Sequence, residues 1–121
     1  MAKGNILVVD WRGDPDCMTC SLRDAGWFVD VEFEDGAQAY RLVLTEQPDA
    51  VVIDLGSRPS HGRELAVSLQ NTVETRDIPL IFLDGAEQVR AQLGARIPHA
   101  VFTTWAGLEA MLDSLEQSRE R

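Results

Sequence analysis

Short apolar runs alternate with amphipathic segments along the whole chain. Three runs are apolar throughout and rich in β-branched residues, the pattern of strands buried on both faces of a parallel sheet. Two further runs are less uniform and predict strands that are more exposed. The five predicted strands cover residues 6–9, 28–33, 50–53, 78–83 and 99–102.

The segments between these strands repeat apolar residues at helical spacing. In the first of them, Asp14 can cap a helix and Pro15 suits its first position, with Met18, Leu22 and Ala25 facing inward. Alternating strands and helices with short loops predict one α/β domain over residues 1–121, a doubly wound, five-stranded parallel sheet. The five predicted helices cover residues 15–25, 37–47, 62–71, 86–93 and 105–117.

Charge and composition narrow the classes of partner. The 121 residues carry a formal net charge of −9, and 45% of them are hydrophobic. Such an acidic surface disfavours direct binding to nucleic-acid phosphates or anionic membranes. No apolar run approaches the ~20 residues of a membrane span. Two cysteines three positions apart do not make a secreted disulfide framework, so we expect a cytoplasmic protein.

Three of the predicted strands are followed by an aspartate: Asp10, Asp54 and Asp84. Because parallel strands end at the same edge of a sheet, we expect these carboxylates to form an acidic pocket there. We expect no basic side chain to balance them. A bound cation, Mg²⁺ or Ca²⁺ held by Asp10 and Asp54, or a protonated carboxyl with a raised pKa would then relieve their repulsion. In the other interpretation, Asp84 only caps the following helix through capping-box spacing to Glu87.

Several motifs together resemble the receiver domain of bacterial response regulators over nearly the whole chain. They are Ile-Leu-Val-Val-Asp at 6–10, Gly-Ala-Gln-Ala-Tyr-Arg-Leu at 36–42, Pro-Asp-Ala-Val-Val-Ile-Asp-Leu at 48–55, Pro59 with Gly62, and Ile-Pro-Leu-Ile at 78–81. The resemblance implies a flavodoxin-like fold and a signalling module, not an enzyme. It places Asp54 at the position that accepts a phosphoryl group from a histidine kinase. It also implies a partner protein, either that kinase or an output protein, and leaves a homodimer open.

The chain departs from the receiver pattern at three positions. Trp11 follows Asp10 where receivers carry a second acid for Mg²⁺, Asp84 replaces a Thr or Ser, and Thr103 replaces a Lys. Phosphoryl transfer needs cations to offset charge on the transferring oxygens. Two carboxylates ~4 Å apart instead repel by ~4 kcal/mol at an effective dielectric of ~20.

These departures predict a degenerate receiver, or pseudo-receiver, that acts through protein–protein contact. A conventional receiver phosphorylated on Asp54 is the alternative. A lysine or arginine reaching the acidic edge would remove the electrostatic objection to that alternative.

Two other features suggest different roles. Cys17 and Cys20 have the spacing of a thioredoxin-like redox pair near a helix start, or are simply two small residues on a helix flank. Trp105 opens the last helix, on a face that receivers use to contact partners. The residue fits an interaction surface or core packing equally well.

Overall fold

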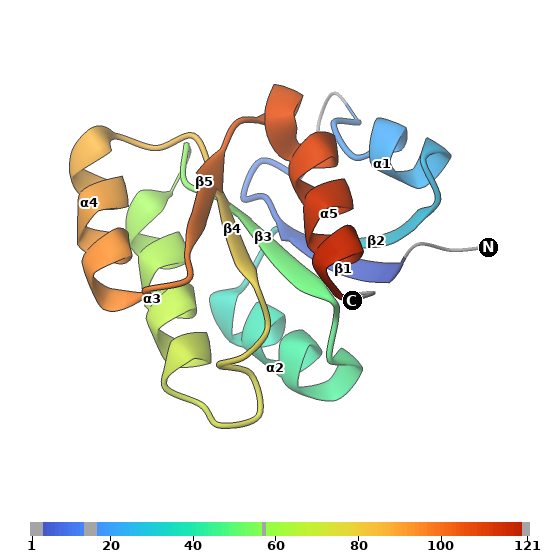
Figure 1. Ribbon diagram of the computed structural model, residues 1–121. Coiled ribbons are helices and arrows are strands. Elements are labelled where there is room, and N and C mark those ends of the chain that lie inside the picture. The colour runs from blue at the N-terminus through green and yellow to red at the C-terminus, as the bar shows by residue number, and fades with distance from the viewer. Residues whose placement is uncertain (1–3, 14–16, 57, 120–121) are drawn as a thin grey trace.

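The computed structural model describes residues 4–13, 17–56 and 58–119, with side chains as far as residue 115. Its centre is a five-stranded sheet in the order β2-β1-β3-β4-β5 (Figure 1), and every neighbouring pair is parallel. This confirms the predicted fold class. The strands are β1 (Gly4–Val9), β2 (Trp27–Glu32), β3 (Ala50–Asp54), β4 (Leu80–Leu83) and β5 (Val101–Thr103).

Helices cover both faces of the sheet, and each face has its own core. Successive strand residues point to opposite sides, so Leu7 and Val9 pack under α2, α3 and α4 while Ile6 and Val8 pack under α1 and α5. Every residue of β3 is buried, as its unbroken apolar run predicts. The helices are α1 (Cys20–Asp24), α2 (Gly36–Glu46), α3 (Pro59–Gln70), α4 (Glu87–Arg96) and α5 (Trp105–Arg119).

The first helix differs most from its prediction. It begins at Cys20 and has five residues, and Met18 is 37% exposed where an inward position was expected. Cys17 adopts a left-handed backbone with φ 48° and is joined to Cys20 by a disulfide, which explains why the helix does not start earlier. The predicted cap and first residue of that helix, Asp14 and Pro15, lie outside the described residues.

The start of α4 also corrects a prediction. The helix begins at Glu87, and its N-cap residue Ala86 has no side-chain hydrogen bond to the helix. Asp84 instead follows β4 directly and has a left-handed φ of 59°. The interpretation of Asp84 as a helix cap is therefore wrong. In the described part of the chain, no helix has both the length and the apolar character to span a bilayer.

Candidate functional site

Two aspartates meet at the carboxyl ends of the central strands. β1 and β3 are hydrogen-bonded neighbours, with Val9 opposite Ile53. Asp10 follows β1 and Asp54 is the last residue of β3, so both carboxylates lie at the same edge of the sheet. The chain runs from β1 outward to β2 and then back to β3, which makes this the switch point where open α/β folds place their sites. Asp10 is 0% exposed and Asp54 is 1% exposed.

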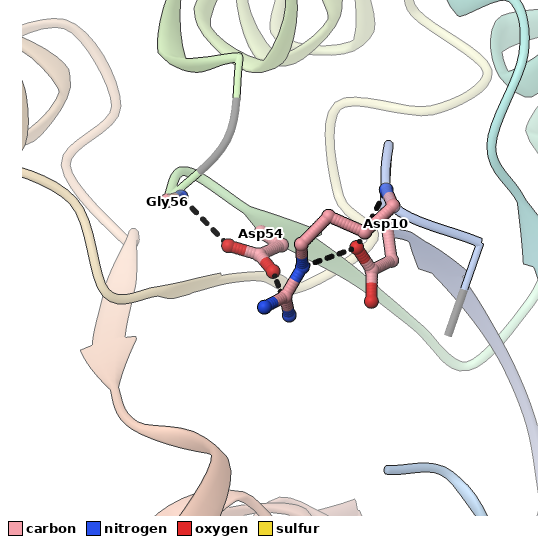
Figure 2. A network of polar contacts seen from close by, with 4 residues as sticks. Asp10, Asp54 and Gly56 are labelled. Carbon is pink, nitrogen blue, oxygen red and sulfur yellow. Dashed lines mark hydrogen bonds and ion pairs between the residues drawn. The ribbon is translucent and has the colours of Figure 1, made fainter. Parts of the chain in front are cut away.

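The side chain of Arg12 joins the two carboxylates (Figure 2). Its Nε lies 3.2 Å from Oδ1 of Asp10, and its Nη2 lies 2.8 Å from Oδ2 of Asp54. The second oxygen of Asp54, Oδ1, accepts a hydrogen bond of 2.7 Å from the backbone N–H of Gly56. We call the contacts of Arg12 with Asp10 and Asp54 the Arg12 bridge. Through this bridge and the N–H of Gly56, each oxygen of Asp54 accepts a hydrogen bond.

A tight turn brings Arg12 back over the strand ends. The N–H of Gly13 donates to the carbonyl of Asp10 at 2.9 Å, which closes a β-turn around Trp11 and Arg12, and Gly13 itself has a positive φ of 80°. The N–H of Arg12 donates to Oδ1 of Asp10 at 3.0 Å, an Asx turn. The sequence signal that could have predicted the bridge is the run Asp10-Trp11-Arg12-Gly13, in which an arginine stands two residues after an aspartate and directly before a glycine.

The Arg12 bridge overturns the expectation that no basic side chain balances the acidic edge. The Arg12 side chain is 46% exposed, yet its pKa is raised by the hydrogen bond to Asp10 and by the charges of Asp10 and Asp54, against an opposing effect of burial. The guanidinium therefore carries its charge at every ordinary pH. The original electrostatic objection to phosphorylation, unbalanced negative charge, does not hold.

Asp84 does not join the two buried carboxylates. Its side chain is exposed and forms no ion pair or hydrogen bond with the other described residues. A Cβ atom built on Gly56 would lie 3.0 Å from Oδ1 of Asp54 and 3.9 Å from Cβ of Asp84, so Asp84 borders the site from β4. The predicted pocket of three carboxylates is thus a buried pair with Asp84 beside it.

The residues at this edge do not fit a divalent cation while the Arg12 bridge is closed. Oδ2 of Asp10 is buried and has no hydrogen-bond partner among the described atoms, which leaves one candidate ligand oxygen. The guanidinium, however, lies between Asp10 and Asp54. No group of three or more His, Cys, Asp or Glu side chains suited to a metal ion occurs in the described ranges. Asp14, considered as a substitute ligand, falls outside those ranges.

Trp11 occupies the position directly after Asp10, where the sequence comparison led us to look for a second acidic ligand. It is 8% exposed and belongs to the core under α2, α3 and α4, with its ring centroid 5.6 Å from that of His61. Its ring therefore packs in this core. Residue 11 adds bulk to the core where a ligand would add an oxygen.

At the far side of the site, Thr103 ends β5 and is half-buried, and its carbonyl accepts a hydrogen bond of 3.2 Å from the N–H of Asp84. The sequence has one lysine, Lys3, which comes before β1 in the chain. The site residues Asp10 and Arg12 come after β1. Trp105 is partly buried against the core under α1 and α5, so packing accounts for much of its ring. Arg12 is the functional residue that the sequence interpretation missed.

No protein-family model matches the chain, and its sequence has no significant match among curated proteins. Solved structures do resemble it. The chemotaxis protein CheY4 of Vibrio cholerae matches with a TM-score of 0.76 at 19% identity, covering 95% of this chain and 98% of that one. The receiver domain of a sensor histidine kinase from Pseudomonas aeruginosa, with magnesium coordinated in its active site cleft, matches with a TM-score of 0.76 at 22% identity, covering 94% and 98%.

A third match is the signal receiver domain of a signal transduction histidine kinase from Syntrophus aciditrophicus. Its TM-score is 0.75 at 20% identity, covering 98% of this chain and 93% of that one. Together these likenesses establish that the chain has the receiver-domain fold. The fold is that of receivers and not of thioredoxins, and the cysteine pair of the thioredoxin-like alternative is present as a disulfide.

Proposed function

We propose that this chain is a receiver-like signalling module of a two-component pathway whose phosphorylation site is degenerate and whose output is protein–protein contact. The Arg12 bridge is the observation that carries the proposal. Together with the N–H of Gly56, it engages both Asp54 oxygens in hydrogen bonds, and it puts a cation between the two carboxylates, 2.8 Å from Oδ2 of Asp54. The similar Pseudomonas aeruginosa receiver domain has magnesium coordinated in its active site cleft, whereas here the cation beside Asp54 is the Arg12 side chain.

The chemistry explains why the bridge weighs against phosphorylation. An Asp54 oxygen would have to attack phosphorus with a free lone pair while the leaving group departs with the bond electrons. Cations must meanwhile offset charge on three phosphoryl oxygens. Arg12 lies 2.8 Å from Oδ2 of Asp54, so it would need to move before a phosphoryl group could approach that oxygen, and the half-exposed guanidinium is the one cation that the described residues bring to the site. Occupancy of Asp54, not repulsion, is therefore the obstacle.

The proposed partner is a signalling protein. The structural neighbours include receiver domains of two histidine kinases, so a kinase or an output protein is the class of partner that the fold favours. A net charge of −9 suits a basic docking face on that partner. Because the Arg12 bridge is intramolecular and permanently charged, the proposed module presents one conformation to its partner without a phosphorylation cycle.

The test is modification of Asp54 by small phosphodonors. The chain is incubated with acetyl phosphate and Mg²⁺, or with beryllofluoride and Mg²⁺, and its mass and ¹⁹F spectrum are recorded. A conventional receiver in the same mixture is the positive control, and Asp54→Asn is the negative control. We expect no adduct on the native chain. Stoichiometric modification that Asp54→Asn abolishes would establish the alternative, a conventional receiver.

A further inference from the structure

We propose that the groove between α3 and α4 is a docking site for an acidic peptide segment of a partner protein, whose carboxylates pair with Arg63 and Arg96. The groove is made of other residues than the Arg12 bridge, so the inference holds whether or not Asp54 is phosphorylated. It also goes beyond the proposed function. There the acidic surface as a whole suits a basic partner face, whereas this groove takes a ligand of the opposite charge.

The groove runs between two helices that lie side by side on one face of the sheet (Figure 1). It has a volume of about 890 Å³, and a smaller recess of about 200 Å³ adjoins it. Pockets that hold drug-sized ligands have volumes of about 300–1,000 Å³, so a few peptide residues fit here. The groove is lined by Arg63, Val67 and Ser68 of α3 and by Gln92, Ala95 and Arg96 of α4.

The two arginines of the groove have no carboxylate partner among the described residues. Nη1 of Arg63 donates to Oε1 of Gln92 across the groove at 2.7 Å, which orients the guanidinium and leaves its other N–H groups for a ligand. Arg96 is exposed and forms no hydrogen bond or ion pair with the rest of the described chain. Both charges are therefore available, although the sequence has 20 acidic residues for 11 basic ones.

The charge of these two helices differs in sign from that of the whole chain. Together α3 and α4 contain three arginines and two glutamates, a net charge of +1, whereas the chain carries −9. Of the two glutamates, Glu87 lies in the first turn of α4 and Glu64 lines the groove. An acidic segment is repelled by most of the surface and attracted here, which directs it to this groove.

The positions of the two arginines set the spacing of the carboxylates. Arg63 reaches Gln92, and Arg96 lies four residues further along the same helix, a rise of about 6 Å. Side chains on one side of an extended peptide are about 7 Å apart. An extended segment with acidic residues at alternate positions therefore matches the groove, and each carboxylate can form charge-assisted hydrogen bonds with one guanidinium.

The adjoining recess favours a peptide over a simple carboxylate ion. Gln70 lines the recess, and its Oε1 is buried and accepts no hydrogen bond from the described residues. Buried acceptors are normally paired with a donor. A peptide brings N–H groups that can donate to this oxygen once the side chain turns into the recess, whereas a carboxylate ion has only acceptors.

Peptide titration followed by amide NMR tests the groove. The ¹⁵N-labelled full chain is titrated at low salt with an acetylated and amidated decapeptide of alternating glutamate and alanine. We expect saturable shifts at Val67, Gln92 and Arg96, with a dissociation constant of about 0.1–1 mM. Binding should weaken about two- to fivefold in Arg63→Gln and in Arg96→Gln, the range for exposed ion pairs, and should weaken further as salt is added.

Arg41→Gln is the matched control. Arg41 lies on α2, is exposed and also donates to a glutamine, with Nη2 2.9 Å from Oε1 of Gln38. The variant removes the same charge from outside the groove, so it should bind the peptide as the native chain does. The same decapeptide with glutamine in place of glutamate should not bind.

The proposal is overturned if no saturable shifts occur, if they lie outside α3 and α4, or if Arg41→Gln weakens binding as much as Arg63→Gln. Acetate at the same carboxylate concentration must not reproduce the shifts, because the site would then bind a simple anion. Tighter binding of inorganic phosphate or of a single-stranded RNA in this groove would equally overturn the assignment to an acidic peptide.

Discussion

Arg12 and Asp54 are 42 positions apart in the sequence, yet Nη2 of one lies 2.8 Å from Oδ2 of the other. The first residue is half-exposed and the second is buried at the end of β3. A carboxylate in such a position needs a cation, and the loop after β1 supplies one from within the chain. The predictions below concern what that contact contributes and what it prevents.

Removal of the guanidinium should destabilise the fold. Arg12→Ala leaves Asp10 and Asp54 buried side by side without a cation, and we expect a loss of about 1–3 kcal/mol in the free energy of unfolding, less than for a fully buried pair because Arg12 is half-exposed. Urea unfolding of the native chain and of the variant, followed by tryptophan fluorescence, measures this difference in the free energy of unfolding. In Arg12→Ala/Asp54→Asn the loss should be smaller than the sum of the single losses, whereas strict additivity would show that the contact contributes nothing.

The contribution of Arg12 should not vary between pH 7 and pH 10. Its pKa is raised in the folded state, chiefly by the hydrogen bond to Asp10. A group with a raised folded pKa gives its full stabilisation below its unfolded pKa and loses it only as the pH rises through the folded value. The difference in unfolding free energy between the native chain and Arg12→Ala should therefore be flat over this window.

Arg12→Lys offers the matched control for that pH series. An amine titrates near pH ~10.4 when unperturbed, so the lysine variant should begin to lose stability relative to the native chain toward the alkaline end of the window. A native-minus-Arg12→Ala difference that itself shrinks between pH 7 and pH 10 would contradict the assignment of the raised pKa to the bridge.

Two helical glycines should respond oppositely to alanine. A Cβ atom on Gly62 of α3 would lie 2.9 Å from Cγ2 of Ile53 and 3.0 Å from Cδ2 of Leu55, so Gly62→Ala should cost about 1–3 kcal/mol through overpacking. On Gly94 of α4 it would meet only Phe102, at 3.9 Å. Gly94→Ala should therefore gain about 0.5–1 kcal/mol from helix propensity. Thermal unfolding of both variants measures these changes in stability. If Gly62→Ala leaves the stability unchanged, α3 can shift away from β3 to make room for the added methyl group.

The sequence predicted the sheet because burial on both faces leaves an unbroken apolar run, as in β3 and at residues 6–9 of β1. It also predicted that Asp10 and Asp54 would meet, because parallel strands end at one edge. The bridge was missed because its geometry depends on a turn of four residues, Asp10 to Gly13, and not on any periodic pattern. The late start of α1 was missed for a related reason: Met18 fits the helical repeat, but Cys17 adopts a backbone conformation that a repeat cannot reveal.

Opening the bridge should let a cation bind between Asp10 and Asp54. In Arg12→Ala, Oδ1 of Asp10 and Oδ2 of Asp54 lose the guanidinium, Oδ2 of Asp10 already has no hydrogen-bond partner among the described atoms, and a buried carboxylate pair attracts Mg²⁺ or Ca²⁺. At a concentration about tenfold above its dissociation constant, the ion should stabilise the variant by about 1.4 kcal/mol. For a chain of this size, that is a rise in melting temperature of roughly 4–8 °C.

The native chain, with Arg12 between the carboxylates, should show no such rise in either salt. Arg12→Ala/Asp10→Asn is the control, because it lacks the guanidinium and one carboxylate together and should respond weakly. Equal Mg²⁺ stabilisation of the native chain and Arg12→Ala would show that the guanidinium does not compete with a metal ion, and the occupancy explanation for an unphosphorylated Asp54 would then fail.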